Sequence, residues 1–115
     1  ACYLSIWLCL TIMTYLKVEI FVPTSYIKEL ITALNQAGLL KDGNYDYCYS
    51  YTPVKGHFRP LDGAKPFIGE VGEIEEVDEL KVEFRIKATD KELAESIILE
   101  KHPYETPVFN FIELV

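Results

Sequence analysis

The sequence predicts an α+β fold in which two helices cover one face of an antiparallel sheet. Strand-like alternation of apolar and polar residues recurs along the chain, and two segments repeat apolar residues at helical spacing. The elements follow one another in the order β-α-β-β-α-β, which is typical of a ferredoxin-like sandwich. A chain of 115 residues is long enough for one such domain around a single modest core.

The first half of the chain is expected to hold a strand at residues 16–22 and a helix at residues 27–37. The alternating apolar residues of the strand are Leu16, Val18, Ile20 and Val22. Pro23 ends the strand. Residues at helical spacing then follow, namely Ile27, Leu30, Ile31, Leu34 and Ala37. Thr24 or Ser25 is the expected N-cap, and Gly38 is the expected C-terminal stop.

Residues 45–51 are predicted to form the second strand, because tyrosines alternate there with small or polar residues: Tyr45, Tyr47, Tyr49 and Tyr51. These rings either pack beneath the helices or belong to a sheet face that meets a partner chain. Residues 52–72 are rich in Gly and Pro and show no sustained period, so they are expected to form a long surface loop. Such loops are usually functional or pack between subunits.

The second half of the chain repeats the pattern of the first. Residues 80–87 alternate cleanly and predict a strand, and Thr89 and Glu92 have the spacing of a capping box. The apolar face of the following helix consists of Leu93, Ala94, Ile97 and Ile98. His102 and Pro103 end that helix, and residues 108–114 form the last strand. The acidic run between residues 70 and 79 is interpreted as a solvated turn that leads into the strand at residue 80.

Residues 1–12 are expected to lie outside the domain, which then spans residues 13–115. They are uncharged and strongly apolar but shorter than a membrane span, and they lack the charged start and small-residue cleavage site of a signal peptide. We interpret them as an extension that arises from cloning or from the choice of start site. An extra edge strand or oligomer contact, or a role in export, remains open. One cysteine falls within the domain, Cys48, which fits a cytoplasmic protein.

The formal net charge of −7 argues against nucleic acid as a partner. Basic residues are scattered, and the best cluster, between residues 55 and 65, is interrupted by Asp62. No P-loop or dinucleotide-binding glycine pattern is present, and no CxxC pair suggests zinc. We therefore expect neither nucleic-acid binding nor membrane insertion.

Four motifs carry a resemblance to a known family. In chain order they are GNYDYC at 43–48, GHFRP at 56–60, GAKPFIGEVG at 63–72 and HPYETP at 102–107. Together they resemble the inserted middle domain of the Nif-three-like (NGG-one-interacting-factor-three-like) proteins, over roughly residues 13–115. The resemblance implies a PII/CutA-like fold, because that insert is similar to the PII signalling and CutA proteins, which are ferredoxin-like trimers. The chain looks like a free-standing version of the insert.

The resemblance does not carry the family's metal site to this chain. In full-length members two flanking halves supply the ligands of a dinuclear metal site, whereas this chain has two histidines and lacks those halves. No residue maps onto the nucleotide-binding loops of the PII proteins. We therefore assign no catalytic residue.

The candidate ligand-binding residues lie in the two Gly- and Pro-rich segments, and they are His57, Arg59, Lys65, Glu70, His102 and Glu105. We expect the Gly56–Gly72 loop and the His102–Glu105 turn to lie together and to form a cleft between subunits. A divalent metal ion is the one cofactor that these residues suggest, with His57, His102 and Glu105 as ligands. The alternative is that His102 caps the helix C-terminus and Glu105 accepts backbone or tyrosine hydrogen bonds.

The sequence thus predicts a cytoplasmic homotrimer that acts as a binding or assembly module for a small molecule or metal ion. An enzyme is the less favoured class. The alternatives are a metal-ion-handling protein of CutA type and a subunit of a metal-dependent hydrolase whose catalytic halves lie on another chain.

Overall fold

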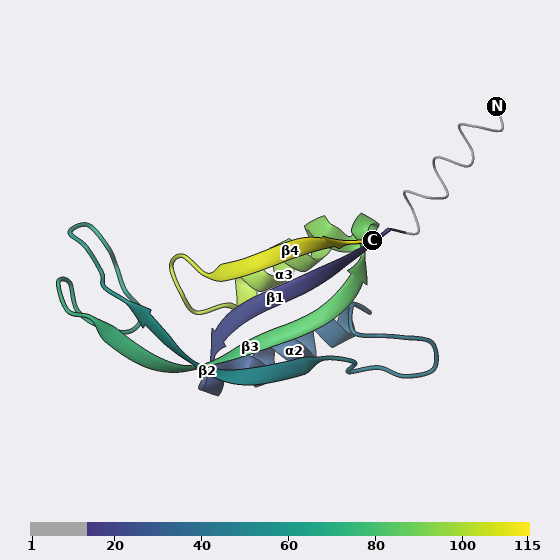
Figure 1. Cartoon of the computed structure of the whole chain (residues 1–115), viewed down its shortest axis with the longest axis horizontal. Coiled ribbons are helices and arrows are strands. Elements are labelled where there is room, and N and C mark those ends of the chain that lie inside the picture. The colour runs from purple at the N-terminus through teal and green to yellow at the C-terminus, as the bar shows by residue number, and fades with distance from the viewer. Residues whose placement is uncertain (1–13) are drawn as a thin grey trace, which may run out of the picture.

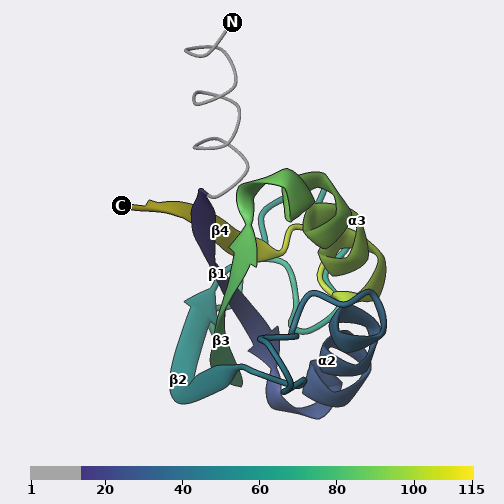
Figure 2. The ribbon, with the colours of Figure 1, turned by 90° about the vertical axis from the view of Figure 1, so that its right-hand side faces the viewer.

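The computed structural model describes residues 14–115, which form a four-stranded antiparallel sheet with two α-helices on one face (Figures 1 and 2). The elements are β1 Tyr15–Pro23, η1 Thr24–Tyr26, α2 Ile27–Gln36, β2 Ser50–Phe58, β3 Glu75–Lys87, η2 Ala88–Asp90, α3 Lys91–Lys101 and β4 Val108–Leu114. The strand order is β2-β3-β1-β4, and this confirms the predicted fold class. The proposed extension at residues 1–12 lies outside the described residues. No helix within residues 14–115 is long and apolar enough to cross a bilayer.

The core lies between the sheet and the two helices. Val18, Ile20 and Val22 of β1 are fully buried, as the alternation predicted. They belong to one buried cluster with Leu34 of α2 and Ile98 of α3. Burying each such aliphatic side chain contributes about 1.5–3 kcal/mol, so this layer supplies much of the stability of the domain.

Gly38 ends α2 as predicted. Its φ angle is +80°, and its N–H donates to the Asn35 carbonyl at 2.9 Å. The N–H of Leu39 donates to the Leu34 carbonyl at 3.1 Å, which completes a Schellman motif.

Replacing Gly38 with alanine is expected to lower the free energy of unfolding by about 1 kcal/mol, because a β-carbon is unfavourable at this φ angle. Gly38→Asn should cost clearly less, since asparagine tolerates the left-handed region. Urea denaturation of the two variants measures the difference. Equal costs for Ala and Asn would show that the conformation of residue 38 does not limit stability.

The predicted side-chain caps are wrong at both helix N-termini. A single 3₁₀ turn precedes each α-helix, so Tyr26 and Asp90 occupy the N-cap positions, and neither makes a side-chain cap hydrogen bond. The Thr24 hydroxyl instead donates to the Asp78 carbonyl in β3 at 3.3 Å. Thr89 lies within η2 rather than before it, so the capping box does not form.

The second strand is shifted relative to the prediction. It spans Ser50–Phe58, so residues 52–58 belong to the sheet and not to the long loop. Tyr47 has a φ angle of +52°, which breaks the expected strand, and its N–H donates to the Asn35 side chain at 2.8 Å. The four tyrosine rings are 36–76% exposed, so they do not pack beneath the helices. β3 likewise begins at Glu75, five residues earlier than expected.

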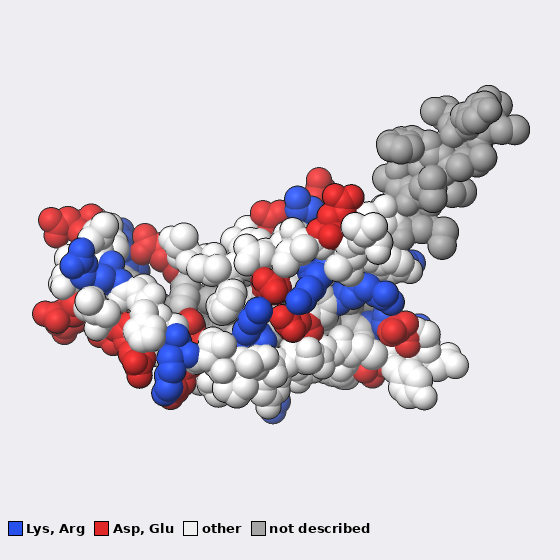
Figure 3. Space-filling view, in the orientation of Figure 1, with Lys and Arg blue, Asp and Glu red and all other residues white. Residues whose placement is uncertain are grey.

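The helix-free face of the sheet carries interleaved charges at its centre (Figure 3). Lys17 and Lys81 each form ion pairs with both Glu19 and Glu83, at 3.2–3.5 Å. The two glutamates are direct neighbours across β1 and β3, and the lysines offset their repulsion. The hydrogen bond from Lys17, and to a lesser extent that from Lys81, holds the pKa of Glu83 below its usual value. The charges of this face are therefore balanced within one chain.

Candidate ligand-binding cleft

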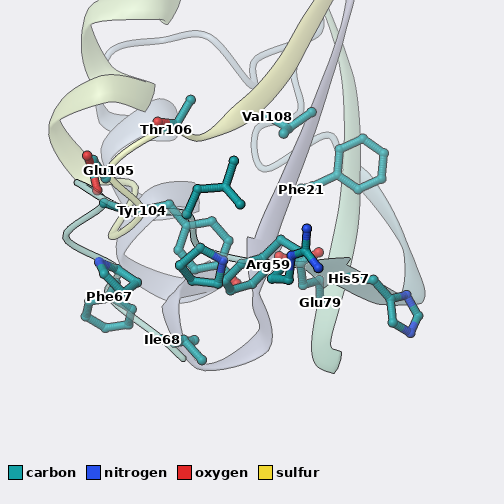
Figure 4. Close-up of a pocket in the computed structure, with 16 residues that line it drawn as sticks. Phe21, His57, Arg59, Phe67, Ile68, Glu79, Tyr104, Glu105, Thr106 and Val108 are labelled. Carbon is teal, nitrogen blue, oxygen red and sulfur yellow. The ribbon is translucent and has the colours of Figure 1, made fainter. Parts of the chain in front are cut away.

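A cleft of about 560 Å³ lies near one end of the sheet (Figure 4). At that end β2 and β3 extend beyond β1 (Figure 1). One wall comes from the end of β2 and the loop after it, residues 56–68, and the other from residues 104–108, which lead into β4. Phe21 of β1 and Glu79 of β3 lie between them. The two Gly- and Pro-rich segments therefore lie side by side, as the sequence predicted. The backbone N–H of Lys65 ties them together by donating to the Glu105 carboxylate at 2.8 Å.

Aromatic rings form much of the lining. Phe21, Phe58, Phe67 and Tyr104 all line the cleft. The ring of Tyr104 lies 5.9 Å from that of Phe58 and 6.4 Å from that of Phe67, measured between centroids. Tyr26 at the start of α2 packs edge-on against Phe67, at 5.3 Å and 89°. Such contacts hold the rings in a defined arrangement, so the cleft has preformed apolar walls.

A carboxylate lies at the base of these walls. Glu79 is only 7% exposed, and it forms no ion pair with any described residue. It fits there because residue 56 on the neighbouring strand is glycine: a β-carbon at Gly56 would overlap the Glu79 carboxylate. Gly56 thus makes room for a buried acidic group.

The Tyr104 hydroxyl is also buried at this point and has no hydrogen-bond partner among the described residues. It lies close enough to Glu79 to be influenced by its charge, without a hydrogen bond of ordinary geometry between them. Burial, with the Glu79 carboxylate adding to it, raises the pKa of Tyr104 well above its ordinary value. The hydroxyl therefore stays protonated and offers a donor next to the carboxylate.

His102 supports the cleft from beneath. It is 6% exposed, and its Nε2 lies 2.6 Å from the Phe21 carbonyl, while its Nδ1 lies 3.1 Å from the backbone N of Tyr104. Because the carbonyl can only accept and the N–H can only donate, Nε2 carries the proton and Nδ1 accepts. Burial lowers the pKa of the imidazole, although the hydrogen bond to Phe21 and the charge of Glu79 oppose this. Neutral His102 thus joins β1 to the turn before β4.

The other predicted ligand-binding residues differ in where they lie relative to the cleft. Arg59 and His57 line the cleft, and His57 pairs with Glu76 at 3.0 Å, with its ring on the outer side (Figure 4). Lys65 contributes its backbone N–H, and Glu105 accepts it, as the alternative interpretation of Glu105 expected. Glu70 does not line the cleft.

The three predicted metal ligands do not lie together in the structure: they are His57, His102 and Glu105. No group of three or more His, Cys, Asp or Glu residues suited to a metal ion occurs within residues 14–115. Both ring nitrogens of His102 are already hydrogen-bonded within the fold. His102 also ends α3, where its N–H donates to the Ile98 carbonyl at 2.9 Å, and this structural role is the alternative that the sequence left open.

Sequence reasoning missed Glu79 and the aromatic lining. Glu79 belongs to the acidic run that we interpreted as a solvated turn, but residues 75–79 are part of β3. The available signal was Gly56 within a strand, since a glycine there often marks the close approach of another group.

Comparison with known proteins identifies relatives of this segment. No protein-family profile matches the chain. It is 48% identical over 100 residues to a Staphylococcus epidermidis protein named GTP cyclohydrolase 1 type 2 homolog, and 44% identical to the protein of that name from Staphylococcus aureus. Among solved structures, a Bacillus cereus protein related to NIF3 matches with a TM-score of 0.74 and 30% identity, over 88% of this chain and 26% of that one. The chain is homologous to one segment of the Nif-three-like proteins.

The match to these relatives is partial in length. The alignment takes in 87% of this chain but only 27% of either staphylococcal relative. CutA from Synechococcus elongatus matches with a TM-score of 0.64 over 89% of this chain and 78% of its own, at 20% identity. The chain thus has the CutA-like fold expected of the Nif-three-like insert.

Proposed function

We propose that this Nif-three-like segment is a ligand-binding and assembly module that works as a homotrimer. The observation that carries the proposal is the cleft, where two segments far apart in the sequence meet around preformed aromatic walls and a buried carboxylate. Its volume lies in the range of small-molecule sites, and convergent polar groups on apolar walls are typical of such sites. We place the protein in the cytoplasm, because a domain with one cysteine, Cys48, suits a reducing compartment.

The edges of the sheet support the assembly part of the proposal. β2 and β4 are both edge strands, and each has backbone groups available for pairing with another chain. On the helix-free side of β4, Val108, Ile112 and Leu114 are 55%, 42% and 37% exposed. Alternate exposed apolar residues on an edge strand favour contact with a partner. A trimer is the assembly that the resemblance to PII and CutA implies.

Replacing Ile112 with lysine is expected to convert a trimer into monomers, because three buried positive charges would meet no partner in the interface. Sedimentation velocity on the wild-type chain and the variant measures this directly. Leu99→Lys is the matched control, since Leu99 is 55% exposed on α3, on the opposite side of the sheet. A wild-type monomer, or dissociation caused equally by both variants, would contradict an interface at β4.

A second candidate function follows from the name of the relatives. Proteins named GTP cyclohydrolase 1 type 2 homolog suggest that this segment serves within a larger enzyme of that kind. Its catalytic groups would then come from parts of the relatives that this chain does not match. Incubating the chain with GTP and a divalent cation, followed by chromatography, tests whether the segment has this activity itself. This candidate predicts no turnover by the chain alone, because it places the catalytic groups outside the matched segment, and GTP turnover that survives rigorous purification would contradict it.

A further inference from the structure

The environment of Glu79 indicates what kind of ligand the cleft takes. Glu79 is only 7% exposed, and it lines the cleft. A buried carboxylate is costly unless a cation or several donors compensate it. No ion pair to Glu79 is formed within residues 14–115, and the polar group beside it there is the neutral Tyr104 hydroxyl. The described chain therefore supplies no positive charge to this buried acidic group.

The nearby basic side chains do not fill this role. Lys55 pairs with Asp78 instead, and Lys81 pairs with Glu19 and Glu83. Arg59 lines the cleft but is exposed, and it lies beyond ion-pair distance of every described carboxylate. His102 is neutral and already bonded at both ring nitrogens. The positive charge that Glu79 needs is thus not supplied from within the chain.

The lining of the cleft indicates which kind of cation it can bind. A bare metal ion requires several oxygen or nitrogen ligands, whereas no suitable group of three such residues occurs within residues 14–115. The aromatic lining, in which Tyr104 contacts both Phe58 and Phe67, instead suits a cation that also has an apolar body. Aromatic faces attract ammonium groups, and they do so most strongly where water is excluded.

We propose that the cleft binds a small organic ammonium ion, with its charged head on the Glu79 carboxylate and its apolar body against the aromatic walls. The Tyr104 hydroxyl donates to the carboxylate once the ligand is in place, and its oxygen can accept from the ammonium. This inference rests on the proposed function, because it specifies the ligand of the same cleft. The charge of Glu79 repels an anion of similar size at the base of the cleft.

The test compares three probes of similar size that differ in charge: phenethylammonium, 2-phenylethanol and phenylacetate. Isothermal titration of the intact chain is expected to give at least about tenfold tighter binding of the ammonium than of the alcohol, and no binding of the acid. Glu79→Gln should reduce ammonium affinity to that of the alcohol and leave the alcohol unchanged. Glu92→Gln, which removes the same charge from an exposed site on α3, should change neither affinity.

Changes in the NMR chemical shifts of the Phe67 and Tyr104 rings during titration show whether a probe enters the cleft. They are measured on the wild-type chain, so they do not depend on whether a variant folds. Equal affinity of ammonium and alcohol, with both shifting these rings, would overturn the ammonium proposal while the cleft remains a binding site. If none of the three probes shifts the rings, both the ammonium proposal and the cleft as the ligand site are overturned. Ammonium binding that is weakened equally by Glu79→Gln and Glu92→Gln would show attraction by net charge only, and would also overturn the proposal.

Discussion

Replacing His102 with alanine is expected to lower the free energy of unfolding by about 3 kcal/mol. The imidazole bonds the Phe21 carbonyl and the Tyr104 N–H, and its removal leaves both backbone groups without a partner. Each such loss costs about 1–3 kcal/mol, and the vacated volume adds a cavity term. Urea denaturation monitored by circular dichroism measures the change. A loss below about 1 kcal/mol would contradict the bridging role of His102.

The free energy of unfolding is also expected to depend on pH through His102. Burial lowers its pKa in the folded state, whereas the unfolded chain takes up a proton near the ordinary value of about 6.5. Stability is therefore complete above about pH 6.5 and falls as the pH drops below it, by up to about 1.4 kcal/mol per pH unit, until the folded pKa is reached. His102→Gln keeps a donor for Phe21 but has no group that titrates. The stability difference between wild type and this variant should shrink from pH 7.5 to pH 5, and a constant difference would contradict the buried neutral imidazole.

Gly56→Val is expected to lower the free energy of unfolding by about 2 kcal/mol and to reduce ammonium affinity to the level of Glu79→Gln. A side chain at residue 56 occupies the space of the Glu79 carboxylate, which must leave the base of the cleft. Forcing extra volume into a packed site typically costs about 1–3 kcal/mol. Denaturation and isothermal titration of the same variant measure the two effects.

A double-mutant cycle identifies Glu79 as the group that Gly56→Val displaces. If the valine collides with this carboxylate, the same change in a Glu79→Ala background should cost at least about 1 kcal/mol less. Ala64→Val, in the loop that also lines the cleft, is the control and should show no coupling to Glu79→Ala. An equal cost of Gly56→Val in both backgrounds would mean that glycine is needed at residue 56 for another reason.

The fold was predictable where local pattern and burial agree. β1 and the second half of β3 alternate over residues that are buried on one face, and Gly38 ends α2 with the positive φ that its residue type suggests. The second strand was misplaced because its local signals point the wrong way. Residues 45–49 alternate like a strand, but the Asn35 side chain bonds Asp46 and Tyr47, and residues 46–49 form an irregular segment. Pro53 looks like a strand breaker, yet β2 is an edge strand, where a missing N–H is tolerated.

The candidate site was predictable at the level of segments and not of its central group. The Gly- and Pro-rich stretches around His57 and His102 were expected to meet, and they do. Glu79 could not be distinguished from its acidic neighbours, because its burial depends on the pairing of β2 with β3, which places it beside Val54 and close to Gly56. The burial of His102 likewise depends on contact with Phe21, far away in sequence. Contacts between segments far apart in the sequence determine the burial of Glu79 and His102, and a local sequence pattern does not encode such contacts.

The central claim is that the chain forms a trimeric module that binds a ligand in its cleft. Native mass spectrometry of gently purified protein, without a metal-affinity tag, tests it most directly. The account predicts a trimer that carries up to three copies of a small organic cation, lost from the Glu79→Gln variant and retained by Glu92→Gln. A monomer without any adduct, which also fails to take up phenethylammonium, would contradict it.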